Sequence, residues 1–189
     1  MGKSRAIFNV FPNRADIMAA TYNILTGNSQ VKGRIGEVIA SHYLRKQGFI
    51  VNRPSRILKL LGRAGVPNNY EVQFLRHHKK TMDYFAVYPR DDPLLIRKAA
   101  VCEVFAKGGL DKYSKHPRSN GYVVEVKTNL NRRLRVSECQ ARMFRFARKI
   151  GFGVILGLVI FRKSYTAEIT LLDEKGGDVS LPIPQSHAF

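Results

Sequence analysis

The segment from Gly121 to Phe161 predicts a strand, a helix and a second strand in succession, and this order constrains the fold more than any other feature of the chain. Gly121 to Thr128 is rich in valine, as expected for a strand. A helix is predicted over Glu138 to Ile150, where the Ser-x-x-Gln pattern of a capping box stands at the start. Val154 to Phe161 is almost wholly apolar, which is typical of a strand covered on both faces. Such a β-α-β unit has a right-handed crossover and predicts an α/β fold, with a mixed sheet flanked by helices.

Other segments add helices and strands around this unit. Helices are predicted over Arg14 to Leu25 and Val31 to Gln47, and strands over Phe49 to Val51, Met82 to Tyr88 and Tyr165 to Leu172. The pattern between Pro54 and Lys80 is weak and predicts only a strand around Tyr70 to Leu75. A helix is predicted over Pro93 to Lys107, with a strand over Ala100 to Phe105 as the alternative.

These elements are expected to form a single domain, because the sequence has no internal repeat or low-complexity tract. The domain, residues 1–189, would carry an N-terminal helical extension, an insertion and a C-terminal tail over residues 1–30, 89–120 and 173–189.

The charge of the chain indicates the kind of partner. Among 189 residues, 32 Lys and Arg exceed 14 Asp and Glu, giving a net charge of +18. With 44% hydrophobic residues the composition is globular, which excludes an unfolded basic tail. We expect a polyanionic partner, and prefer nucleic acid to a membrane because no basic amphipathic anchor helix is evident. No apolar run approaches the roughly 20 residues that span a bilayer, so we expect a cytoplasmic, nucleoid-associated protein.

Cysteine and histidine do not form a recognised metal-binding pattern. Cys102 and Cys139 are the only cysteines, which is too few for a four-ligand iron–sulfur cluster and does not indicate a disulfide framework. The five histidines have no zinc-ligand spacing.

Two acidic residues interrupt otherwise apolar strands. Glu125 and Lys127 are two residues apart on one strand, so they point to the same face, about 6.6 Å apart. Asp83 interrupts the strand predicted over Met82 to Tyr88, and two adjacent strands would bring its carboxylate beside that of Glu125. Two such carboxylates would repel each other unless a divalent cation lay between them, and carboxylates with water suit Mg²⁺. The alternatives are a solvent-facing strand with a cross-strand ion pair and, for Asp83, bonds to the neighbouring backbone.

A helix bearing Gly36-Glu37 precedes these strands, and Gln140 follows them at the start of the next helix. Together with Asp83 and Glu125-Val126-Lys127, this order resembles the PD-(D/E)XK nuclease superfamily. The resemblance extends over residues 32–161. The stretches Val136 to Gln140 and Phe146 to Gly151 are especially similar to archaeal Holliday junction resolvases. The family implies a restriction-endonuclease-like core with the element order α-β-β-β-α-β.

The resemblance also implies the metal ligands. Asp83, Glu125 and the backbone carbonyl of Val126 would bind Mg²⁺, for which Mn²⁺ would substitute. In the family the aspartate precedes the E-x-K motif by a short hairpin, whereas here residues 89–120 intervene. Asp111 is therefore an alternative ligand, although Asp83 is preferred because it lies in a strand pattern.

Three further residues would complete the site that the resemblance implies. Lys127 would be the catalytic lysine, Glu37 would support a metal-bound water or a second ion, and Gln140 would orient Lys127 or the substrate phosphate. For Glu37 the alternative is a helical surface pair with Arg34, and for Gln140 it is the capping box itself.

Basic residues around the E-x-K strand are expected to bind DNA phosphates. Arg132, Arg133 and Arg135 follow the strand, and Arg142 lies on the next helix, whose N-terminus near Ser137 offers backbone N–H groups. The alternative for the helix arginines is an ordinary solvated face. The run from His77 to Lys80 is either a second contact or a plain loop.

The sequence therefore predicts a Mg²⁺-dependent DNA endonuclease of a structure-specific, junction-resolving kind that acts in recombination and repair. The resemblance to junction resolvases also suggests a homodimer, since two symmetric cuts need two active sites. One alternative is a RecB-like exonuclease that processes single strands or ends. Another is a non-catalytic nucleic-acid-binding protein on the same fold, which would bind without cutting.

Overall fold

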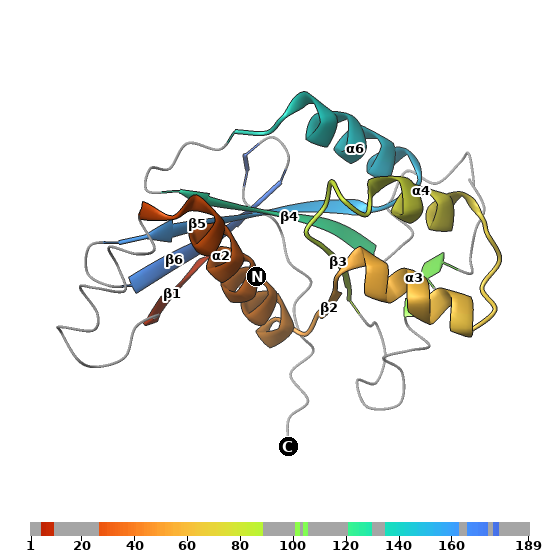
Figure 1. Ribbon diagram of the computed structural model, residues 1–189, viewed down its shortest axis with the longest axis horizontal. Coiled ribbons are helices and arrows are strands. Elements are labelled where there is room, and N and C mark those ends of the chain that lie inside the picture. Colours follow the sequence, from red (N-terminus) through yellow and green to blue (C-terminus); the bar gives the residue numbers. More distant parts are fainter. Residues whose placement is uncertain are drawn as a thin grey trace, which may run out of the picture. The chain divides into compact units, whose positions relative to one another are not determined.

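The computed structural model has an α/β fold with a mixed sheet and flanking helices (Figure 1). It describes residues 5–9, 27–88, 101–102, 104–105, 121–129, 135–162, 166–173 and 176–177. Its elements are β1 (Arg5–Asn9), α2 (Ser29–Lys46), β2 (Ile50–Asn52), α3 (Pro54–Arg63), α4 (Tyr70–His78), β3 (Tyr84–Val87), β4 (Gly121–Asn129), α6 (Glu138–Lys149), β5 (Gly153–Phe161) and β6 (Thr166–Leu172).

The strands form one sheet in the order β1-β6-β5-β4-β3-β2. Four neighbouring pairs are antiparallel: β1 with β6, β6 with β5, β4 with β3, and β3 with β2. β4 and β5, the two strands of the predicted β-α-β unit, are neighbours in the sheet. The predicted α/β class is therefore confirmed.

The chain forms two compact units. The first comprises residues 1–43, 126–135 and 156–189, and the second comprises residues 44–125 and 136–155. β4 and β5 both begin in the second unit and end in the first. The expected single domain stays a prediction.

In the first unit, a buried carboxylate joins the strands at one side of the sheet. Glu168 on β6 is only 4% exposed and forms ion pairs with Arg5 of β1 and with Arg162, which follows β5. Both arginine side chains are partly exposed. The carboxylate is thus neutralised inside the unit while the guanidinium groups remain in contact with water, which lowers the cost of its burial.

The helix predicted over Val31 to Gln47 is confirmed by α2. Gly48 ends the helix with a positive φ of 89°, a conformation that glycine adopts without steric cost. The backbone N–H groups of Gly48 and Phe49 donate to the carbonyls of Arg45 and Leu44. These bonds satisfy the last carbonyls of the helix and lead the chain directly into β2.

The prediction for residues 54–80 is wrong, because two helices occupy the segment in place of a strand. Pro54 opens α3, whose side chains Ile57 and Leu61 are buried one turn apart. Asn69 caps α4 by accepting a hydrogen bond from the backbone N–H of Val72. The valine and aromatic content of the α4 segment favours a strand, but its buried residues follow helical spacing.

Aromatic rings form the core of the second unit. Phe85 of β3 lies 4.9 Å from Phe152 and 5.1 Å from Phe105, measured between ring centroids, and Phe74 of α4 lies 5.7 Å from Phe152. All four rings are almost completely buried. The Nδ2 group of Asn69 also donates to the carbonyl of Phe105. Burial of a phenylalanine side chain contributes about 1.5–3 kcal/mol, so this part of the predicted insertion belongs to the core.

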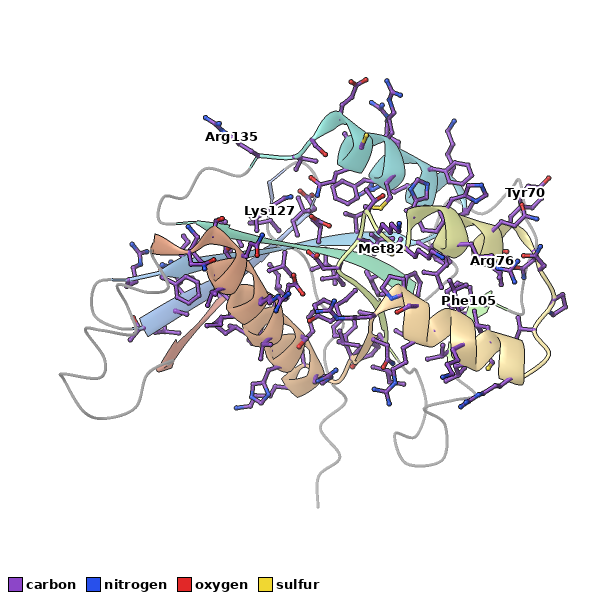
Figure 2. The ribbon with its side chains drawn as sticks, in the orientation of Figure 1. Tyr70, Arg76, Met82, Phe105, Lys127 and Arg135 are labelled. Carbon is purple, nitrogen blue, oxygen red and sulfur yellow. The ribbon has the colours of Figure 1, made fainter. Side chains whose placement is uncertain are left out.

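The described residues of the insertion, 101–102 and 104–105, are helical, which favours the predicted helix over the alternative strand (Phe105 is labelled in Figure 2). The helix predicted over Arg14 to Leu25 and the alternative ligand Asp111 lie outside the described residues, as does most of the expected tail. None of the described helices has both the length and the apolar character that crossing a bilayer requires.

Candidate active site

Glu125 is a buried acidic side chain in the middle of β4. It is 5% exposed, and its neighbours Val123 and Val124 are completely buried. Its Oε1 accepts a hydrogen bond from Nε2 of Gln140, on the first turn of α6. A carboxylate in such a setting is costly unless hydrogen bonds or a cation compensate its charge. The burial of Glu125 is therefore unlike that of a solvent-facing strand residue, which was the plain alternative.

The register of β3 and β4 brings Asp83 toward Glu125. The antiparallel ladder pairs Phe85 with Val123 and Tyr84 with Val124. Continued by one residue, the same register sets Asp83 opposite Glu125. Directly opposed residues have Cβ atoms roughly 4.5–5.5 Å apart. Asp83 lies immediately before β3 and not within it, and its side chain is half-buried.

Gln140 has two structural roles at once. Its Oε1 accepts from the backbone N–H of Ser137 at 3.1 Å, and its own backbone N–H donates to Oγ of Ser137 at 3.3 Å, which completes a capping box. Its Nε2 is thereby directed to Glu125. The two interpretations of Gln140, cap and site residue, are both consistent with this geometry, and the partner that the structure shows is Glu125.

Lys127 and Val126 lie on the part of β4 that belongs to the first unit, where both side chains are half-buried. Lys127 is labelled beside β4 in Figure 2. Alternation along the strand directs Lys127 to the same face as Glu125, two residues earlier. Lys127 and Glu125 belong to different units, so a shared catalytic role of the two side chains stays a prediction.

Glu37 is half-buried on α2, which packs closely on the end of β4 in the first unit. The neighbouring Gly36 is buried, and a Cβ atom built there would lie 1.9 Å from Cγ2 of Thr128. Only glycine allows this approach. Glu37 and Lys127 thus lie in the first unit, whereas Asp83, Glu125 and Gln140 lie in the second, and the structure describes each set by itself.

The predicted phosphate-binding residues divide into four cases. Arg132 and Arg133 lie outside the described residues, and Arg135 is exposed and extends away from the chain before α6 (Figure 2). Arg142 is exposed and forms an i,i+4 ion pair with Glu138 at 2.5 Å. The Oγ and backbone N–H of Ser137 are engaged in the capping box. Arg135 and Arg142 are therefore the described members that present a charge to solvent.

The donor set of the second unit suits a hard divalent cation. Two carboxylates in register, together with water, match the few protein ligands and near-octahedral oxygen coordination that Mg²⁺ prefers. Among the residues that the structure describes, no cluster of three or more His, Cys, Asp or Glu side chains is placed to hold a metal. A metal ion at this place would be held by Asp83 and Glu125, with other oxygen ligands completing the coordination.

One surface is not evident from the sequence. The ends of α4 and α6 expose a set of cations around Phe146, whose ring is 42% exposed and contacts α4. Because the sequence predicts a strand in place of α4, it does not predict this surface. The Asn-x-x-Val start and the helical spacing of buried residues in α4 are the available signals.

Comparison of the chain with models of known protein families, with curated proteins and with solved structures finds no match. The function proposed below therefore rests on the geometry of the residues just described.

Proposed function

We propose that the protein is a metal-dependent nuclease that hydrolyses phosphodiester bonds in DNA, on a restriction-endonuclease-like core. The observation that carries the proposal is the buried Glu125 on β4 beside a β3–β4 register that, continued one residue beyond Tyr84, would set Asp83 opposite it. Two carboxylates brought opposite each other, one before β3 and one in the middle of β4, in a chain of net charge +18, would suit a site where a polyanion meets a divalent cation.

Each residue has a defined part in this proposal. Asp83 and Glu125 bind the cation, and Gln140 holds Oε1 of Glu125 in place through its hydrogen bond. When bound, Mg²⁺ supplies charge neutralisation and a more acidic water for attack on phosphorus. Lys127 stabilises the negative charge that develops on the phosphate oxygens. Glu37 orients water from α2. A structure-specific, junction-resolving substrate is our preferred choice within DNA.

The proposal is tested by incubating the purified protein with branched, duplex and single-stranded DNA in Mg²⁺ or Mn²⁺. Wild-type protein is expected to cut at least one of these substrates, the branched one best, and EDTA is expected to abolish cutting. Asp83→Asn, Glu125→Gln and Lys127→Met should each reduce the rate of cutting about 100-fold or more, because they remove electrostatic stabilisation of the transition state.

Glu138→Gln is the matched control, since Glu138 is an exposed acid on α6 that the proposal does not use. This variant should cut like wild type. The proposal fails if no substrate is cut, or if Asp83→Asn and Glu125→Gln retain wild-type rates while folding normally by circular dichroism.

A further inference from the structure

In the second unit, α4 and α6 lie side by side, and their C-terminal ends meet (Figure 1). The ring centroid of Phe146 on α6 lies 5.7 Å from that of Phe74 and 6.4 Å from that of His78, both on α4. Phe74 is buried, whereas Phe146 is 42% exposed. Phe146 is thus fixed on one side by α4 and presents the rest of its ring to solvent.

The surroundings of Phe146 are strongly cationic. Lys79 and Lys80 directly follow His78 and are exposed, and Lys149 is exposed one helical turn after Phe146. Arg145, beside Phe146 in the chain, is exposed as well. The sequence contains no Asp or Glu over residues 72–82 or 139–152, so no acid of either segment offsets these charges.

We propose that this surface binds single-stranded nucleic acid. The α4–α6 surface, as we define it, consists of His78, Lys79, Lys80, Arg145, Phe146 and Lys149. An unpaired base stacks on the exposed face of Phe146, and the lysines and arginine bind the phosphates on either side. The pairing of a rigid aromatic ring with closely spaced cations is the combination by which single strands are held without sequence preference.

The exposed ring of Phe146 favours single-stranded nucleic acid over duplex DNA or a membrane. Cations in the last turn of a helix also interact favourably with the helix dipole, and cations alone would attract duplex DNA or an anionic membrane equally. A duplex keeps its bases stacked within the helix, so a surface phenylalanine gains most from a base that is unpaired. A membrane would require a larger apolar area than a single half-exposed ring provides.

This inference rests on the proposed function only in taking nucleic acid as the partner. It concerns metal-independent binding at α4 and α6 and does not depend on cleavage. A nuclease with such a surface would hold the unpaired segment of a branched or partly melted substrate.

The experiment measures binding of a fluorescent single-stranded DNA of about 12 nucleotides by anisotropy in EDTA. Phe146→Leu keeps an apolar side chain against Phe74 but removes the flat ring, and should weaken binding about 5- to 100-fold. Phe146→Tyr keeps an aromatic ring and should bind with an affinity within about twofold of wild type. Tyr70→Leu is the control, because Tyr70 is an exposed aromatic residue at the other end of α4.

The charge contribution is measured separately from the salt dependence. Lys79→Gln together with Lys80→Gln should reduce the slope of log affinity against log salt by about 1.4, about 0.7 for each phosphate that is no longer neutralised. Lys59→Gln, an exposed lysine on α3, should have a smaller effect. The same variants are tested with duplex DNA and with anionic phospholipid vesicles.

Several results would overturn the inference. The inference fails if Phe146→Leu binds single-stranded DNA as tightly as wild type, or if Tyr70→Leu loses as much affinity as Phe146→Leu. It also fails if wild type does not bind single-stranded DNA, or binds duplex DNA or vesicles more tightly. A chain that binds single strands through Phe146 in EDTA but cuts no DNA in Mg²⁺ would support the inference and reject the nuclease.

Discussion

Gln140 donates a hydrogen bond from Nε2 to Oε1 of Glu125, while its Oε1 accepts from the backbone N–H of Ser137. One amide group therefore connects the N-terminus of α6 with the acidic centre of β4. Both heteroatoms of the amide are used, so their positions are fixed by the capping box on one side and by the carboxylate on the other. The arrangement makes the conformation of Glu125 depend on the cap of a helix.

Replacing Gln140 with leucine is expected to lower the free energy of unfolding by about 2.5–4 kcal/mol. About 1 kcal/mol reflects the weakened cap, and about 1.5–3 kcal/mol reflects the lost bond to a buried carboxylate. Ser137→Ala, which disturbs the cap alone, should cost only about 1 kcal/mol. Urea denaturation of both variants measures the difference. Equal losses would show that the bond to Glu125 adds nothing to stability.

Gly36→Ala is expected to destabilise the protein by about 1–3 kcal/mol, because the new Cβ would lie 1.9 Å from Cγ2 of Thr128. Thr128→Ala should largely rescue it, since the nearest remaining atom, Cβ of residue 128, lies at 3.4 Å. Gly33→Ala on the same helix meets no atom within 4 Å and should stabilise by about 1 kcal/mol through helix propensity. Thermal unfolding of the four variants provides the test, and additive effects of Gly36→Ala and Thr128→Ala would contradict it.

Burial lowers the pKa of His78 below its ordinary value of 6.5, and the neighbouring His77 adds to this effect. The folded state therefore binds a proton less readily than the unfolded state. Stability is fully present above pH 6.5 and decreases as the pH falls through 6.5 toward the lower pKa of the folded protein. His78→Phe, which keeps a ring beside Phe74, should lose less stability than wild type between pH 7.5 and about pH 5. Melting temperatures at the two pH values measure the contrast, and parallel losses in both proteins would refute it.

The two thiols are expected to react at different rates. Cys102 is half-buried, and burial raises the pKa of its thiol, whereas Cys139 at the start of α6 is exposed. Because the thiolate is the reactive form, iodoacetamide should label Cys139 first under native conditions. Mass spectrometry of a time course measures the two rates. Cys139→Ser should remove the fast phase, and a Cys102 that reacts as fast would be inconsistent with its placement.

The sequence predicts β4, α6 and β5 well because their signals are local. Each element is determined by a signal of a few residues: the valines of β4, the Ser137–Gln140 cap of α6 and the apolar run of β5. The observed bounds of all three elements lie close to the predicted bounds. The neighbouring position of β4 and β5 follows from the crossover rule for such units. These elements carry Glu125, Lys127 and Gln140, so most of the candidate site could be listed in advance.

The remaining features depend on contacts between distant segments. The aromatic and β-branched residues of α4 are those of a strand and predict one, whereas the burial of Phe74 against Phe152 favours the helix. The register that sets Asp83 opposite Glu125 is fixed by pairing across residues 89–120, which no local pattern reveals. The contact of Phe146 with α4 cannot be foreseen from a sequence pattern that predicts a strand in place of α4.

The passage of β4 and β5 from one unit to the other has a consequence for synthesis of the chain. Every residue of the second unit lies at or before position 155, so its core uses no residue from the last part of the given sequence. The first unit takes β6 and most of β5 from residues after position 155. Asp83, Glu125 and Gln140 are therefore synthesised before most of β5 and all of β6, which complete the unit carrying Lys127.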